Sequence, residues 1–238
     1  MDNANYVTLT RQSGLLREMQ AVANNIANIA TTGFRKEGLV FSEFVQSTGA
    51  DTASLSMALG DVRATFQTQG SLSRTGATFD LAIEGEGFFV VSTPEGDQLT
   101  RAGSFTPDAE GLLATPDGYH LQGSGGAPIF IPPDAGSVKI AADGTLSVGD
   151  VPIAKIGIFR PDNPLEIERK QGVRFAVQGP ISPVENSVIL QGFLEDSNVN
   201  PVAEIARMIE VQRAYELGQA FLDKEDERIR SVLQTLGK

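Results

Sequence analysis

The residues best suited to chemistry in this 238-residue chain are three carboxylates near its middle. Asp80, Glu84 and Glu86 fall within one short stretch. Two carboxylates held on either side of a glycosidic bond can hydrolyse it. Clefts that bind glycans commonly carry aromatic platforms, however, and the chain has no Trp and three Tyr. We therefore keep a cell-wall glycan hydrolase with helical extensions as an alternative, and expect Gly85 and Gly87 to serve a backbone turn.

No other set of residues predicts a catalytic, cofactor or metal site. The chain has one His, His120, and no Cys, so a zinc site would need His120 with carboxylates only. The Gly85-Glu86-Gly87 run begins like a dinucleotide fingerprint, but Val90 stands where the last Gly belongs. Asp117-Gly118 and Asp143-Gly144 predict hairpin turns, because the further acidic residues of a calcium loop do not follow. We expect no enzyme, no cofactor and no small-molecule substrate.

Composition limits the partners further. The net charge is -11, and residues 41–194 carry eighteen acidic and nine basic groups, so the sequence offers no basic patch for a nucleic acid. No apolar run reaches the roughly 18 residues that would span a membrane. The start of the chain lacks the basic and apolar regions of a Sec-type signal peptide. By default this indicates the cytoplasm, unless a dedicated export route exists.

A first apolar stripe predicts a helix from about Asp2 to about Ala30. Asp2 is a good N-cap residue, and Gly33 suits the left-handed position that follows a helix. One row of apolar residues has three- and four-residue spacing, and a second row has members seven apart: Leu9, Leu16, Met19, Ala23, Ile26 and Ala30, then Leu15, Val22 and Ile29. Three asparagines, weak helix formers, are expected to form side-chain hydrogen bonds across helices: Asn24, Asn25 and Asn28.

The end of the chain predicts a longer helix. Asn200 is a suitable N-cap, and Pro201 occupies the first helical position. A heptad seam follows, interrupted at Gly218 and Glu225. Its members are Met208, Val211, Tyr215, Gly218, Leu222, Glu225, Ile229, Val232 and Leu236. We expect this seam to pair with the first helix in one chain. Because two helices cover only one side of each other, we also expect further partners.

Residues 79–193 have the pattern of a β domain. Short alternating runs are separated by turn signals such as Glu95-Gly96 and Glu110-Gly111. Short strands with frequent turns predict an irregular, mainly antiparallel barrel or sandwich. The predicted fold class is therefore α+β, with the terminal helices packed as a coiled-coil-like layer. The predicted divisions are 1–36 for the first helix, 37–78 for an extended connector with one strand near Val62–Thr68, 79–193 for the β domain and 194–238 for the last helix.

Several stretches resemble the signatures of bacterial flagellar rod and hook proteins. The N-terminal signature is Ala23–Asn28 with Thr31–Arg35, and the C-terminal signature is Ser197–Asn200 with Met208–Glu216. Three stretches of the middle fit as well: Asp80–Phe89, Thr100–Thr106, and Glu110–Leu113 with Asp117–Tyr119. These motifs occur in the family's order over both ends and most of the body, which argues against chance agreement.

The resemblance implies a structural subunit of the flagellar basal body. Such subunits are exported by the flagellar type III export apparatus without cleavage, which would reconcile the missing signal peptide with a periplasmic rod. Their terminal helices form an inner tube around the export channel, and their β bodies project outward. The rod transmits torque from the motor to the hook. The implied partners are other rod subunits, proximal and distal, and the export apparatus during secretion.

Within the family, the length and the short connection after the first helix favour a proximal-rod member over a distal-rod member, and a hook protein would be longer. A binding module that uses the acidic β surface is a further alternative class. For packing between subunits we predict residues on both terminal helices. They are Leu16, Met19, Val22, Asn24, Asn25, Ile26, Asn28, Ile29, Met208, Val211, Tyr215, Leu222, Ile229 and Val232.

Overall fold

The computed structural model describes residues 2–46, 55–163, 166–184 and 187–236. The chain forms two compact units. Unit 1 is built from Met1–Ile29, Lys36–Gln67 and Val199–Lys238, and unit 2 from Ala30–Arg35 and Thr68–Asn198. The short segment Ala30–Arg35 thus belongs to unit 2, although both of its neighbours in the sequence belong to unit 1.

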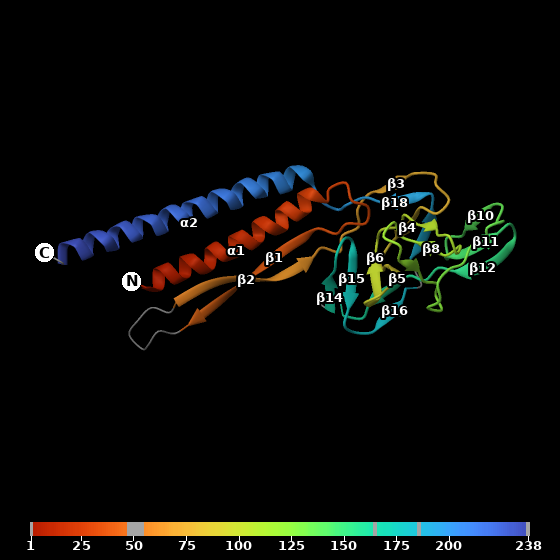
Figure 1. Cartoon of the computed structure of the whole chain (residues 1–238), viewed down its shortest axis with the longest axis horizontal. Coiled ribbons are helices and arrows are strands. Elements are labelled where there is room, and N and C mark those ends of the chain that lie inside the picture. Colours follow the sequence, from red (N-terminus) through yellow and green to blue (C-terminus); the bar gives the residue numbers. More distant parts are fainter. Residues whose placement is uncertain (1, 47–54, 164–165, 185–186, 237–238) are drawn as a thin grey trace. The chain divides into compact units, whose positions relative to one another are not determined.

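Unit 1 contains both helices, α1 (Asp2–Ala27) and α2 (Pro201–Leu236), which lie side by side (Figure 1). The predicted start of α2 is confirmed, since the Ala203 amide donates to Asn200 Oδ1 at 3.1 Å. α1 ends three residues before its predicted end. There the Asn28 amide is shared between the carbonyls of Asn24 and Asn25, a bifurcated bond typical of a tightening last turn.

Two long strands complete unit 1. β1 (Glu37–Gln46) pairs antiparallel with β2 (Leu55–Thr65), with a bulge between Val40 and Phe41, and both strands contact α1. This hairpin occupies much of the stretch expected as a connector with one strand. β1 was missed because its sequence, EGLVFSEFVQ, does not alternate strictly between apolar and polar residues. The bulge is one reason, since an extra residue shifts which side chains share a face.

Unit 2 is built from antiparallel strands. A seven-stranded sheet has the order β14-β15-β6-β5-β9-β8-β7, with bounds Ile167–Arg169, Arg174–Val177, Gly96–Thr100, Phe89–Thr93, His120–Leu121, Leu113–Ala114 and Thr106–Pro107. A three-stranded sheet joins β10 (Val138–Ile140), β11 (Thr145–Val148) and β12 (Val151–Lys155). Three pairs complete the unit: β3 (Leu72–Arg74) with β18 (Phe193–Glu195), β4 (Leu81–Glu84) with β17 (Val188–Gln191), and β13 (Phe159–Pro161) with β16 (Ile181–Pro183).

These sheets confirm the α+β class and correct one part of the prediction. Every strand order within the described ranges is linear, so the β domain is not a closed barrel. The strands of unit 2 have two to five residues, and most are separated by turns. Strands this short cannot supply the continuous ladder that closure requires, and the domain remains a set of small open sheets.

The main core of unit 2 lies among the strands on which the prediction relied. Its fully buried members include Leu81, Phe89, Leu113, Leu121 and Leu146. Phe89 meets the ring of Phe105 edge-on, with ring centroids 5.5 Å apart. Burying each such side chain contributes about 1.5–3 kcal/mol before entropy is subtracted. This core gives unit 2 its own source of stability.

Candidate assembly surface and buried arginine cluster

The predicted apolar seams of the two helices meet within one chain. Leu15 and Val22 of α1 and Val211 of α2 are buried. Several predicted packing residues are half-buried: Met19, Ile26, Ile29, Met208, Tyr215 and Leu222. Asn25 faces Glu204, Glu18 faces Arg207 and Gln12 faces Tyr215, so the helices run antiparallel. The chain therefore covers part of its own seam.

Other seam residues remain uncovered because α2 is longer than α1. α1 has 26 residues and α2 has 36. With Gln12 opposite Tyr215, the start of α1 reaches only to about Glu225 on α2. We call residues 226–236 the overhang; Figure 1 shows the blue end of α2 extending past the red start of α1. Ile229 and Val232 in the overhang are 38% and 49% exposed, and Leu16 on α1 is 46% exposed.

Gly218, which interrupts the predicted seam, provides space for a polar side chain. Gln12 is 7% exposed, and its Nε2 donates to the Tyr215 carbonyl at 2.9 Å. A Cβ atom built at Gly218 would lie 2.3 Å from that Nε2. Gly218 and Gln12 therefore fit as a hole and a knob, and the Tyr215 bond fixes how α1 is placed along α2.

This fit predicts that Gly218→Ala changes the free energy of unfolding in opposite directions when residue 12 is Gln and when it is Ala. Gly218→Ala should lower the free energy of unfolding of unit 1 by about 1–2 kcal/mol, because the new methyl group displaces the buried Gln12 amide. In a Gln12→Ala background the same change should raise it by up to about 1 kcal/mol, the helix propensity difference between Gly and Ala. Urea unfolding followed by helical circular dichroism measures both. Equal effects in the two backgrounds would show that the residues do not interact.

The three asparagines at the end of α1 have two different roles. Asn25 is fully buried. Its Nδ2 donates to Glu204 Oε2 at 2.9 Å and to the Glu37 carbonyl at 2.8 Å, and its Oδ1 accepts from the Glu37 amide at 2.8 Å. Asn25 thus joins α1, β1 and α2. Asn28 Nδ2 donates along the helix to the carbonyl and the Oδ1 of Asn24.

Glu204 was not predicted as a site residue, yet it lies at the centre of this polar contact. Its side chain is nearly fully buried, and its Oε1 pairs with Lys36 Nζ at 2.5 Å. Nearby, Glu18 pairs with Arg207. The signal for Glu204 was its place on the same face as Met208 and Val211, four and seven residues before them in the seam. Heptad spacing alone does not identify Glu204, because a charged residue rarely lies in a seam without a partner.

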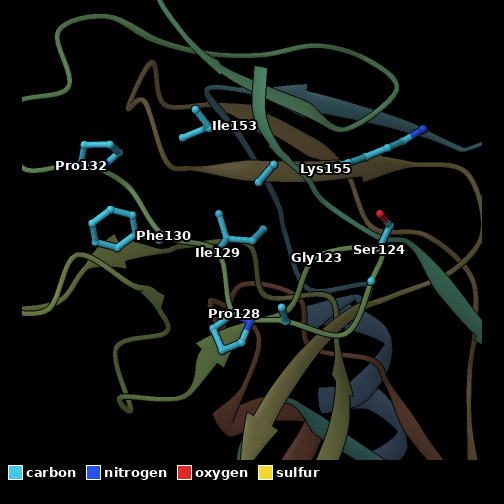
Figure 2. Close-up of a pocket in the computed structure, with 11 residues that line it drawn as sticks. Gly123, Ser124, Pro128, Ile129, Phe130, Pro132, Ile153 and Lys155 are labelled. Carbon is cyan, nitrogen blue, oxygen red and sulfur yellow. The ribbon is translucent and has the colours of Figure 1, made fainter. Parts of the chain in front are cut away.

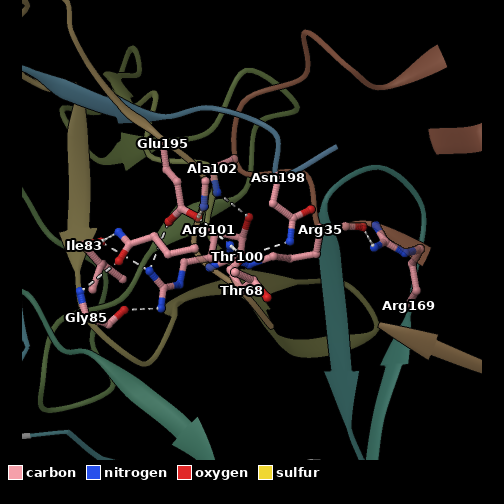
Figure 3. Close-up of polar contacts among 12 residues, drawn as sticks. Arg35, Thr68, Ile83, Gly85, Thr100, Arg101, Ala102, Arg169, Glu195 and Asn198 are labelled. Carbon is pink, nitrogen blue, oxygen red and sulfur yellow. Dashed lines mark hydrogen bonds and ion pairs between the residues drawn. The ribbon is translucent and has the colours of Figure 1, made fainter. Parts of the chain in front are cut away.

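In unit 2, Glu195 and two arginines form a buried ion cluster (Figure 3). Glu195 pairs with Arg35 at 2.6 Å and with Arg101 at 3.0 Å, and all three side chains are buried. Arg101 also donates to the carbonyls of Ile83 and Gly85, and Arg35 donates to the carbonyl of Thr68. We call Arg35, Arg101 and Glu195 the arginine cluster. It joins residues that are far apart in the sequence.

Burial changes the acidity of this cluster. It lowers the pKa of the Arg35 guanidinium to about 10, although Glu195 acts in the opposite direction. Burial also lowers the pKa of Arg101, again opposed by Glu195. Arg35 nevertheless keeps its charge near neutral pH, because a pKa of about 10 lies well above it. The single carboxylate of Glu195 therefore compensates two buried cations.

The segment before Arg35 is also held closely in unit 2. The Gly33 amide donates to the Glu195 carbonyl at 2.7 Å, and Gly33 has a φ of +69°. A Cβ atom there would lie 2.3 Å from the Ala102 amide nitrogen. Phe34 is buried, and the Arg169 guanidinium lies 4.7 Å from the centre of its ring. These contacts explain why Ala30–Arg35 belongs to unit 2.

The carboxylates that suggested a hydrolase have separate settings. Glu86 is 80% exposed and forms an ion pair with Arg160 at 3.3 Å. Asp80 is half-buried and forms a main-chain bridge with Ser104. Gly85 and Gly87 have φ values of +109° and +104°, which confirms the predicted backbone turn.

His120 pairs with a neighbouring carboxylate. Its Nε2 lies 2.9 Å from Asp108 Oδ2. The pKa of the Asp108 carboxyl lies below its usual value, chiefly because the Leu112 amide donates to it, and His120 adds to the effect. Among the described residues, no group of three His, Cys, Asp or Glu is placed to hold a metal ion. Neither helix in this part of the chain is long and apolar enough to cross a membrane.

A groove beside β12 is one of the open pockets of unit 2. It has a volume of about 360 Å³ and is lined on one side by eight residues between Gly123 and Pro132 and on the other by Ile153, Ala154 and Lys155 (Figure 2). Phe130 and Ile153 are both substantially exposed beside it. The groove is mainly apolar, whereas the predicted binding surface was acidic.

Three segments of the chain match known families. Residues 6–35 match the family described as "Flagella basal body rod protein". Residues 82–148 match "Flagellar hook protein FlgE/F/G D1 domain", and residues 190–235 match "Flagellar basal body rod FlgEFG protein C-terminal". Arg35 and Glu195 of the arginine cluster each lie in a different one of these segments, and Arg101 lies in the third.

Full-length relatives agree with these matches. The chain is 43% identical to the flagellar basal-body rod protein FlgF of Caulobacter vibrioides, over 100% of this chain and 99% of that protein. It is 36% identical to FlgF of Mesorhizobium japonicum over the same shares. The rod protein FlgG of Bacillus subtilis is 31% identical, over 96% of this chain and 97% of that protein. The chain therefore belongs to the flagellar basal-body rod protein family, and within it is more similar to these FlgF members than to this FlgG member.

Proposed function

We propose that this chain is a structural subunit of the proximal part of the flagellar rod, and that its terminal helices pack against those of neighbouring rod subunits. The packed helices would form a coiled-coil-like layer that encloses the export channel, and the rod would transmit motor torque through it. Membership of the rod family makes the chain a structural rod subunit of the basal body. The FlgG-like alternative is less favoured by the identities given above.

The observation that supports the packing proposal is that some apolar residues of the two helices are buried within the chain while others remain exposed. α2 exposes large apolar side chains along its length. They are Val202, Ile205 and Ile209 near its start, Leu217 and Phe221 beside the contact with α1, and Ile229, Val232 and Leu233 on the overhang. A stripe of this kind on a helix indicates a contact surface. At about 25 cal/mol per Å² of apolar area, covering it would favour association strongly. Neighbouring subunits with similar helices are suitable partners.

The predicted packing residues divide into two groups in this proposal. Val22, Asn25 and Val211 are buried and would hold the helical pair of one subunit together. Leu16, Ile229 and Val232 are exposed and would contact neighbouring subunits. The half-buried members would contribute to both contacts. Part of each side chain packs within the helical pair, and a neighbouring subunit would cover the part that remains exposed. Asn24 and Asn28 bond to each other at the end of α1.

The same proposal includes how the chain leaves the cytoplasm and where it assembles. The family resemblance supports export through the flagellar type III apparatus without a cleaved leader, followed by assembly into the periplasmic rod. Basal bodies purified from cells that produce the chain should then contain it with its N-terminal sequence uncut. The intact mass of the incorporated protein measures this, and a shortened N-terminus would contradict export without cleavage.

The packing proposal is tested by placing a charge on the exposed seam. Leu16→Asp and Val232→Asp should each abolish swimming in a strain that lacks the native gene, since burying an unpaired carboxylate against an apolar partner costs several kcal/mol. Both residues are exposed in the single chain, so the monomer should keep its helical circular dichroism. Gln219→Asp, also exposed on α2, is the matched control and should swim normally. Full motility with both seam variants would refute the proposed interface.

A further inference from the structure

The overhang is the continuation of a contact that already exists within the chain. Ile229 and Val232 lie at heptad positions of the seam whose earlier members, Val211 and Leu222, face α1. Beyond about Glu225 this face has no α1 residue opposite it. The overhang therefore presents an apolar helical face of the same kind that packs against a helix elsewhere in unit 1.

A groove that fits such a helix lies between α1 and α2 of the same unit. It has a volume of about 400 Å³, and its walls include Val7 and Leu15 from α1 and Leu217 and Phe221 from α2. Leu217 is 73% exposed at its edge. The groove is mainly apolar and open along one side. A channel of this kind between two antiparallel helices can accept a third helix.

One polar atom in the groove points to an amphipathic occupant. Gln12 lines the groove and is more than nine-tenths buried, and its Oε1 has no hydrogen-bond partner among the side chains and main-chain groups that the structure describes. An unpaired buried acceptor costs about 1–3 kcal/mol. An occupant that brings a donor as well as apolar side chains would recover this energy. The overhang combines Ile229 and Val232 with exposed polar neighbours such as Gln234.

We infer that the overhang of one copy packs into the groove of a second copy, a contact that rests on the proposed function and specifies one interface of it. Placing Val232 beside Gly218 staggers the two α2 helices by two heptads, or about 21 Å along the axis. The contact is head-to-tail, because each copy uses its overhang on one neighbour and its groove on another. Such a contact does not close on itself and extends into a chain of subunits.

Disulfide trapping tests this contact in the full chain, which contains no native Cys. In the double variant Leu217→Cys/Val232→Cys, both thiols lie on α2, fifteen residues and about 22 Å apart. A disulfide requires Cα atoms within about 7 Å, so no bond can form within one chain. Mild oxidation of the concentrated protein should therefore yield a ladder of dimers, trimers and larger covalent species.

The matched control moves one thiol to the other side of the helix. Glu216→Cys/Val232→Cys places the first thiol on an exposed residue that does not line the groove. It should yield at most dimers, as should each single variant. A ladder that is missing from the first double variant, or equally strong in the control, would overturn the contact. Motility of cells that produce the reduced variants separates the two proposals. If these cells swim normally but the purified protein forms no ladder, the rod function stands and this interface is wrong.

Discussion

Replacing Glu195 by Ala is expected to lower the free energy of unfolding of unit 2 by about 3–5 kcal/mol, the range for removing one partner of a buried ion pair. Glu195 is the carboxylate shared by Arg35 and Arg101, and all three side chains are almost completely buried. Without it, the two buried guanidinium groups are left with hydrogen bonds to main-chain carbonyls. Glu195 Oε1 also accepts from the Gly70 amide at 3.1 Å, so a further donor loses its acceptor.

Hydrogen exchange on the full chain measures this loss. Amides of β18, β6 and β4 should exchange much faster in Glu195→Ala, because these strands carry or contact the arginine cluster. Glu195→Gln, which keeps the shape and one acceptor, should show a smaller loss. Glu168→Ala is the control, since its ion pair with Lys170 is exposed and should contribute less than about 1 kcal/mol. Similar exchange in Glu195→Ala and Glu168→Ala would contradict the role given to the cluster.

Asn25→Ala should destabilise unit 1 by about 2–4 kcal/mol. The change removes three hydrogen bonds and leaves the buried Glu204 carboxylate and the Glu37 main chain without this partner. The higher helix propensity of Ala raises the free energy of unfolding by only about 0.6 kcal/mol, which does not offset this loss. Urea unfolding followed at a helical wavelength reports unit 1 specifically, because α1 and α2 both belong to it.

Asn24 supplies a control one residue away. Asn24→Ala makes the same chemical change in the same turn of α1, but Asn24 is half-buried and its side-chain oxygen accepts from Asn28 of the same helix. We expect it to be neutral or slightly stabilising, so adjacent substitutions should differ in sign or by several kcal/mol. Asn25→Asp should also be strongly destabilising, since it sets a second carboxylate beside that of Glu204. Equal stability of the Asn24 and Asn25 variants would show that the buried bonds do not matter.

The helices were predictable from sequence because local rules determine them. The N-cap at Asn200, the Pro at position 201 and the heptad spacing from Met208 to Leu236 are all short-range patterns, and α2 begins and ends where they indicate. The turns of unit 2 were predictable for the same reason. Gly96, Gly118 and Gly144 follow acidic residues and adopt positive φ values, as hairpin signals require.

What could not be predicted depends on contacts between distant residues. Arg35 and Glu195 look like ordinary surface charges in the sequence, and only the fold brings them together. Gly218 looked like a defect of the seam until Gln12, more than two hundred residues away, was found to occupy its space. β1 and β2 were missed as a pair because one register bulge removes the alternation that identifies a strand.

The antiparallel pairing of α1 with α2 has a consequence for the order in which the molecule can be completed. The bond between Gln12 and Tyr215 spans 203 positions, and that between Asn25 and Glu204 spans 179. When a chain is synthesised or exported from its N-terminus, α1 therefore has no partner helix until the residues of α2 are available, late in the process. Unit 2 has its own core and can fold meanwhile. The helical pair is thus the final part of the molecule to form, so in the assembly proposed above its contact surfaces are complete only once the chain is nearly whole.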